Sequence, residues 1–131
     1  MMVVDASALI AILEAEADAG RYATAIADAD APLISAATLI ETGIVMINRH
    51  GPKAIRKVHA LIQEAGIAVE SVTLEQAEIA IDAFAKYGKG QGRKAGLNYG
   101  DCFPYALAKA TGLPLLFKGN DFSKTDIPPV P

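Results

Sequence analysis

The chain has 131 residues, of which 52% are hydrophobic, and this is enough for one domain over residues 1–131 with a buried core. Its net charge of −3 excludes a global basic field for nucleic acid, so any such binding needs a local basic patch. The single cysteine, Cys102, excludes an internal disulfide and fits a reducing compartment. No signal-like segment or membrane-length apolar run is present, so we expect a soluble, cytoplasmic protein with no membrane partner.

Short apolar runs alternate with longer helical patterns in the first half of the chain. We predict a buried strand over 2–4, helices over 8–13 and 17–29, a strand over 32–35 and a helix over 36–50. Ser7 is well placed to cap the first of these helices. In the helix over 36–50, the apolar residues fall on one stripe, made of Ala37, Ile40, Ile44 and Ile47.

The second half continues the alternation. We predict helices over 52–65, 74–87 and 101–111, strands over 67–72 and 113–117, and a helical turn over 120–123. Thr73 and Gln76 form a capping box, and Ala77, Ala80, Ile81 and Phe84 form the apolar face of the helix that follows. Residues 88–96 hold four glycines among three basic residues, which is typical of a mobile basic loop. The tail over 127–131 is expected to be irregular or a short edge strand.

Strands separated by helices indicate an α/β fold. Right-handed crossovers between them give a central parallel sheet of four to five strands, covered by helices on both faces. Ligands of such sheets bind beyond the carboxyl ends of the strands. Functional residues are therefore expected at strand ends and at the starts of the following helices.

Four acidic residues stand out by their positions. Asp5 ends the first strand, Asp101 opens a helix, Asp121 follows the last strand, and Glu41 borders the apolar stripe of its helix. Three of the four lie where strand ends and helix starts meet, so we expect them to converge. Converged carboxylates repel by roughly 4 kcal/mol per pair at ~4 Å and an effective dielectric of ~20. A hard divalent cation with oxygen ligands is the simplest way to offset that repulsion.

Each acid also has an ordinary structural explanation. Asp5, Asp101 and Asp121 are all placed to cap or to charge a helix start, and glutamates on helix surfaces are common. Ser7 is the better cap for the first helix, which leaves Asp5 free for function. Asp82 and Asp126 are weaker candidates for the same site. Neither histidine has the partner at i+4 that a helical zinc motif needs, and Cys102 is expected to be a small buried side chain.

Four segments carry a family resemblance. They are Val3-Val4-Asp5-Ala6-Ser7-Ala8-Leu9, Ser35-x-x-Thr38-x-x-Glu41, Leu97-Asn98-Tyr99-Gly100-Asp101-Cys102 and Leu116-Phe117-Lys118-Gly119-Asn120-Asp121-Phe122. In this order they resemble the PIN-domain ribonucleases, and more closely the VapC toxins of type II toxin–antitoxin systems. The Gly-Asp-Cys and Gly-Asn-Asp-Phe segments are the most specific, and the resemblance spans nearly the whole chain.

The resemblance implies a site and partners. It implies that Asp5, Glu41, Asp101 and Asp121 form an acidic site for Mg²⁺, with Mn²⁺ as a substitute, and cleave RNA endonucleolytically. Ser7, Asn98 and Asn120 are the supporting polar positions. It also implies a homodimer and a VapB-like antitoxin that blocks the active site in a higher assembly. The RNA that is cleaved and the number of metal ions stay open.

Two further questions stay open at this point. Lys89, Arg93 and Lys94 are candidates for RNA phosphate contacts, although a solvated loop explains them nearly as well. The alternatives to a ribonuclease are a non-catalytic antitoxin-binding PIN domain and another metal-dependent phosphohydrolase that acts on a small phosphate ester. The four intact acids argue against the first alternative, and the basic loop argues against the second.

Overall fold

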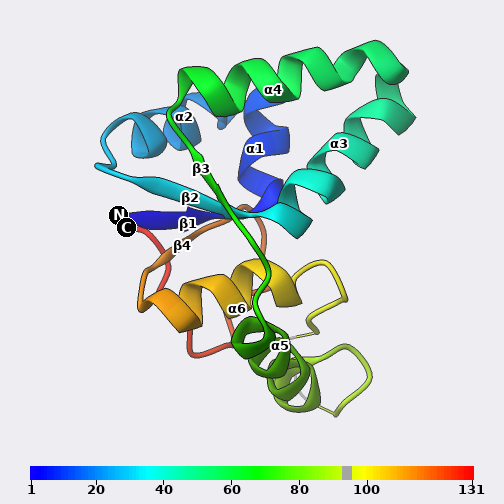
Figure 1. Ribbon diagram of the computed structural model, residues 1–131, viewed down its shortest axis with the longest axis vertical. Helices are drawn as coiled ribbons and strands as arrows, with labels where there is room; N and C mark the ends of the chain where they lie inside the picture. Colours follow the sequence, from blue (N-terminus) through cyan, green and yellow to red (C-terminus); the bar gives the residue numbers. More distant parts are fainter. Residues whose placement is uncertain (93–95) are drawn as a thin grey trace.

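The computed structural model describes residues 1–92 and 96–131, and its centre is a parallel sheet (Figure 1). The strands are β1 (Met2–Val4), β2 (Pro32–Ser35), β3 (Ala68–Glu70) and β4 (Leu115–Leu116), in the order β3-β2-β1-β4. All three pairings are parallel, so the expected sheet is confirmed with four strands. A single bridge between Leu115 and Pro129 lays the tail beside β4.

Helices cover both faces of the sheet, as predicted. On one face lie α1 (Ala6–Leu13), α2 (Ala19–Ala27), α3 (Ala36–His50) and α4 (Ile55–Glu64), the last preceded by a 3-10 turn over Pro52–Ala54 (Figure 1). On the other face lie α5 (Leu74–Tyr87) and α6 (Cys102–Thr111). No helix in the described part of the chain is long and apolar enough to cross a membrane.

The core is divided by the sheet into two clusters. Val4, Ile34 and Leu116 pack with α1 and α2 on one face, whereas Val3 and Leu115 pack with α6 on the other. Successive side chains of a strand point to opposite faces, so strands that are apolar throughout must be covered on both sides. This explains why the sequences of the buried strands do not alternate between apolar and polar residues.

Local signals explain most of the helix ends. The Thr73 hydroxyl accepts a hydrogen bond from the Gln76 N–H at 3.1 Å, which confirms Thr73 as the N-cap of α5, the first half of the predicted capping box. Gly112 ends α6 at a φ of 71°, a conformation that glycine adopts without strain. Residues 120–123 form turns and bends, not the predicted helical turn.

The apolar stripe of α3 does not face the core. Ile40 is 62% exposed and Ile44 is 53% exposed, while the buried face consists of Thr38, Thr42, Gly43 and Met46. Thr42 tolerates burial because its hydroxyl donates to the Thr38 carbonyl at 2.8 Å. On α5 the predicted apolar face is wrong in the same way, since Ile81 is 70% exposed. The exposed stripe of α3 therefore needs another explanation.

Candidate active site

Asp5 lies at the carboxyl end of β1 and caps α1. Its Oδ2 accepts hydrogen bonds from the Ser7 N–H at 3.0 Å and from the Ser7 hydroxyl at 2.5 Å. The prediction that Ser7 is the cap was therefore wrong, because Ser7 lies inside the first turn and serves the aspartate. The other oxygen, Oδ1, is buried and has no hydrogen-bond partner. Burial raises the pKa of Asp5, and the nearby charge of Asp121 adds to this effect.

Ser7 also connects Asp5 to the segment that carries Asp121. Its Oγ accepts a hydrogen bond from the backbone N–H of Lys118 at 2.9 Å, directly after β4. The ammonium group of Lys118 pairs with Glu16 at 2.7 Å and with Asp18 at 3.0 Å. These contacts hold the segment after β4 against α1. Ser7 therefore contacts Asp5 directly, and through the Lys118 backbone it contacts the segment that carries Asp121. Lys118 was not anticipated, since a lysine after a strand carries no distinctive signal.

Asp101 is held by a reciprocal pair of hydrogen bonds with Asn98. The Asn98 N–H donates to Asp101 Oδ2 at 3.0 Å, and the Asp101 N–H donates to Asn98 Oδ1 at 3.1 Å. Asp101 is 7% exposed at the start of α6, where the helix dipole favours its negative charge. Burial nevertheless raises its pKa to about 7, with further contributions from Asp121 and Asp5. Asn98 thus has a defined positioning role.

Glu41 reaches the same place from α3. It is half-buried, and burial raises its pKa, with a further contribution from the charge of Asp5. Its carboxylate lies against the backbone of Gly100, where an added Cβ would stand 1.9 Å from Oε2. Only glycine at this position, directly before Asp101, leaves the Glu41 carboxylate where it is. The glycine was part of a recognised segment, but its closeness to Glu41 could not be read from the sequence.

Replacing Gly100 by alanine is expected to lower activity while the fold persists. The new methyl group would displace the Glu41 carboxylate, which is the mobile end of a flexible side chain, and a displacement of ~1 Å at an active site costs about a hundredfold in rate. Gly20→Ala in α2 is the matched control, because nothing lies within 4 Å of its added Cβ. Thermal melts and rates of RNA cleavage would be compared, and equal rates for both variants would show that Glu41 does not need its present position.

The four acids interact electrostatically, but they do not enclose a position for a metal ion. The charges of Asp5 and Asp121 both act on Asp101, and that of Asp5 acts on Glu41. Within residues 1–92 and 96–131, however, no three acidic, histidine or cysteine side chains are close enough to hold a metal ion unaided. An open arrangement suits Mg²⁺, which keeps several waters and takes few protein carboxylates. The unpartnered Oδ1 of Asp5 is a free buried ligand atom, so these residues fit such an ion.

Three other candidates either make structural contacts or are exposed. Asp126 accepts from the Tyr105 hydroxyl at 2.5 Å and pairs with Lys109 at 2.6 Å, so its role is structural. Asp82 lies on the exposed side of α5, next to that group. Asn120 is exposed, and its carbonyl accepts from the Ser123 N–H at 3.1 Å.

The basic loop is described only in part. Lys89 is exposed, and its backbone N–H donates to the Leu97 carbonyl at 2.7 Å, which closes the loop next to Asn98. Arg93 and Lys94 lie outside the described residues.

Comparison with known proteins gives the family of the chain. The model of the PIN domain family matches residues 2–128. Ribonuclease VapC28 of Mycobacterium tuberculosis is 50% identical over 126 residues, covering 96% of this chain and 95% of its own. Ribonuclease VapC of Mycolicibacterium smegmatis is 48% identical, covering 96% and 97%. The chain belongs to the PIN-domain family, and within it to the VapC ribonucleases.

Solved structures agree on the fold. VapC20 of M. tuberculosis, described as a toxin that cleaves the sarcin-ricin loop, superposes with a TM-score of 0.80 at 22% identity, covering 99% of this chain and 98% of its own. A toxin–antitoxin complex from Klebsiella pneumoniae gives 0.72 at 19% identity, covering 96% and 93%. The expected family, with its ribonuclease activity and its place in toxin–antitoxin systems, is confirmed.

Proposed function

We propose that this VapC ribonuclease hydrolyses RNA phosphodiester bonds at a site made of Asp5, Glu41, Asp101 and Asp121. The proposal is supported by the pairwise charge effects among these acids, which come from four segments of the chain, and by Asp5 Oδ1, which is buried and unpartnered. Mg²⁺ is the proposed cofactor and Mn²⁺ its substitute. When bound, the ion supplies a Lewis acid at the phosphate and lowers the pKa of the attacking water.

The side chains of the site are proposed to have different roles. Asp5 and Asp101 are buried and hydrogen-bonded to Ser7 and Asn98, so they have fixed orientations and hold the cation. Asp121 is exposed and Glu41 is half-buried, so these two are better placed to orient water and to accept a proton from it. Lys89, Arg93 and Lys94 are proposed to contact RNA phosphates.

A substrate panel separates this function from its alternatives. Purified full-length protein would be given single-stranded RNA, single-stranded DNA and p-nitrophenyl phosphate, each in chelator and with Mg²⁺. We expect cleavage of RNA alone, and only with metal. Hydrolysis of the phosphate ester without RNA cleavage would indicate a small-molecule phosphohydrolase. No turnover of any substrate would indicate a non-catalytic antitoxin-binding domain.

A VapB-like antitoxin is the proposed protein partner. Its inhibition is expected to depend on a basic side chain placed among the acids, because an arginine pairs bidentately with carboxylates and fills the space of a cation. Titrating antitoxin into a cleavage assay should reduce RNA cleavage to background at one equivalent, and a variant antitoxin with that arginine changed to alanine should inhibit much less. Full activity at saturating antitoxin would refute this mode of inhibition.

The exposed stripe of α3 is proposed as the homodimer interface. Together with Tyr99 and Phe103, whose rings contact edge-to-face at 5.0 Å, Ile40, Ile44 and Val45 line an open hollow of about 330 Å³. A two-fold interface sets a surface against itself, and most of this surface is apolar, although Glu41 also lines the hollow. This is why we assign the surface to a second copy of the chain.

Ile44→Asp is expected to convert the dimer into a monomer. The change places like charges opposite each other in an apolar contact, where each unpaired charge is costly. Leu74→Asp is the control, since Leu74 is 76% exposed at the start of α5, outside the stripe. Sedimentation equilibrium of both variants would decide, and an Ile44→Asp protein that stays dimeric would place the interface elsewhere.

We further propose a cytoplasmic location, where both RNA and antitoxin are found.

A further inference from the structure

A basic segment lies at the end of α3 and the start of α4. Residues 49–59 contain Arg49, Lys53, Arg56 and Lys57 but no acidic residue, so four of the twelve lysines and arginines fall in this short stretch. The chain as a whole has a net charge of −3. A local concentration of positive charge on an acidic protein is the pattern expected of a polyanion contact.

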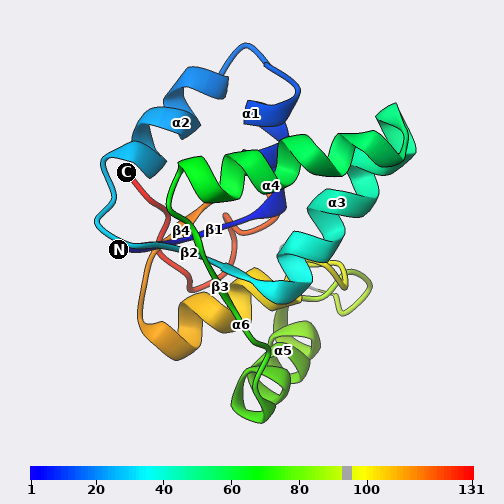
Figure 2. The ribbon, with the colours of Figure 1, turned by 45° about the horizontal axis from the view of Figure 1, so that its top comes forward.

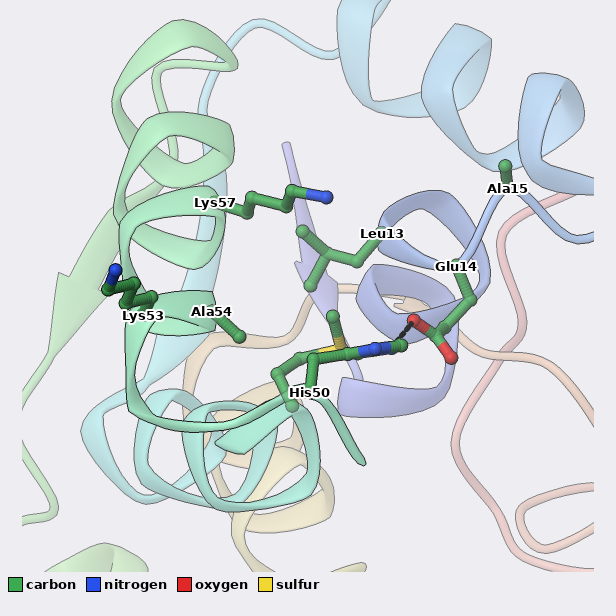
Figure 3. A pocket seen from close by; sticks show the side chains of 8 residues that line it. Leu13, Glu14, Ala15, His50, Lys53, Ala54 and Lys57 are labelled. Atoms are coloured by element: carbon green, nitrogen blue, oxygen red, sulfur yellow. Dashed lines mark hydrogen bonds and ion pairs between the residues drawn. The ribbon is translucent and has the colours of Figure 1, made fainter. Parts of the chain in front are cut away.

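This segment borders a pocket of about 340 Å³ between α1, α3 and α4 (Figure 3). Apolar side chains of Leu13, Met46 and Ala54 form part of its lining, and His50, Lys53 and Lys57 bring nitrogen atoms to its rim. Figure 3 shows the Lys57 side chain extending across the hollow toward α1, while Lys53 turns outward from it. Both lysines are exposed, so the Lys57 ammonium group faces an incoming anion and the Lys53 ammonium group adds positive charge outside the hollow.

The one acidic side chain of the pocket is already neutralised. Glu14 Oε1 contacts His50 Nε2 at 2.6 Å, and Oε2 pairs with Arg49 Nη1 at 3.4 Å. The Glu14 carboxylate therefore pairs with side chains of α3, and this pairing weakens its repulsion of an incoming anion. Among the described residues, Lys53, Arg56 and Lys57 make no ion pair with any acidic side chain. The pocket therefore has an excess of positive charge that no ion pair among the described residues compensates.

The pocket and the acidic site are linked by two helices. Asp5 and Glu14 are the N-cap and C-cap residues of α1, and α3 carries Glu41 in its first half and His50 at its end. Figure 2 shows both helices leading away from the carboxyl edge of the sheet. Nine residues of helix at ~1.5 Å each put the pocket roughly 14 Å from the acids. This separation is several times a hydrogen-bond length, so a ligand in the pocket does not touch the acids.

We propose that the pocket formed by Glu14, His50, Lys53 and Lys57 is a second RNA-binding site, which takes a backbone phosphate away from the scissile bond. The inference rests on the proposed ribonuclease function, because a long polyanion held at the acidic end of α1 and α3 passes within reach of their basic end. Lysine binds phosphate as a point charge. The site favours long or folded RNA over short fragments.

The test compares Lys53→Ala/Lys57→Ala with Lys86→Ala/Lys124→Ala in the full-length protein. The control pair removes the same charge from two exposed lysines outside the basic segment. Binding of a labelled long single-stranded RNA would be followed by fluorescence anisotropy across a salt series, and cleavage of a trinucleotide would be measured in parallel. Loss of two phosphate contacts should lower the slope of log affinity against log salt by about 1.4. The control slope and every trinucleotide rate should stay at the wild-type value.

Four other outcomes would overturn the proposal. They are an unchanged slope in the Lys53/Lys57 variant, an equal change in the control, a loss of trinucleotide cleavage, and a loss of antitoxin binding with an unchanged RNA slope. The last result would assign the pocket to an acidic segment of the antitoxin. Lys53→Arg/Lys57→Arg should restore the slope, which separates a charge effect from damage to the fold. A wild-type protein that neither binds nor cleaves RNA would instead refute the proposed function.

Discussion

Asp5→Asn and Asp101→Asn are each expected to abolish metal-dependent RNA cleavage while leaving the fold intact. Asparagine keeps the shape of aspartate and can still accept the hydrogen bonds from Ser7 or Asn98, but it cannot supply a carboxylate to a cation. Loss of a carboxylate that would hold the cation should therefore reduce cleavage to background. Purified variants would be compared in single-turnover cleavage with Mg²⁺ and with Mn²⁺.

The matched control for these variants is Asp30→Asn. Asp30 is an exposed residue between α2 and β2, and removing its charge changes the net charge by the same amount. Circular dichroism and thermal melts would establish that all three variants are folded. Wild-type cleavage by Asp5→Asn or by Asp101→Asn would remove that residue from the mechanism.

In the absence of metal, the stability of the wild-type protein should fall as pH rises from about 4 to about 7. The pKa of Asp101 is raised from 3.8 to about 7, chiefly by burial and further by the charges of Asp121 and Asp5. Between these values the folded state binds more protons than the unfolded state, so each rise in pH favours unfolding. At ~1.36 kcal/mol per pKa unit the loss is on the order of 4 kcal/mol, shared among the interacting carboxylates.

Metal should reverse this loss, and Asp101→Asn should remove it. A cation that binds only the folded site adds about 2.7 kcal/mol at a hundred times its dissociation constant. The asparagine variant should be more stable than the wild type in chelator above pH 7 and should gain less from Mn²⁺. Urea titrations of both proteins at a series of pH values would measure this. Equal gains from Mn²⁺ would place the ion elsewhere, and a less stable variant in chelator would make Asp101 a structural residue.

Patterns local in sequence predicted the strands and most helices well. The run that became β1 is apolar at every position, the run that became β2 is apolar up to its last residue, Ser35, and glycine, proline or an N-cap residue marks several helix boundaries. The position of Asp5 at a strand end also follows from such a pattern. Choosing between Asp5 and Ser7 as the cap was harder, because both side chains cap helices well and only the backbone geometry at the strand exit decides.

Contacts between distant segments could not be predicted. The closeness of Gly100 to Glu41 and the bond from Lys118 to Ser7 depend on tertiary packing, which no spacing in the sequence reveals. The exposure of Ile40 and Ile44 was missed for another reason. Hydrophobic periodicity identifies an apolar helix face, but it does not distinguish a face that packs in the core from one available to a second chain.

The central claim is that RNA is hydrolysed by a divalent cation held among the four acids. The most direct test is single-turnover cleavage of one defined RNA by the full-length wild-type protein, first in chelator and then across a Mn²⁺ titration, with the product ends mapped. The account predicts no cleavage in chelator and a saturable rise with Mn²⁺ to internal cuts. Cleavage at full rate in chelator would contradict it.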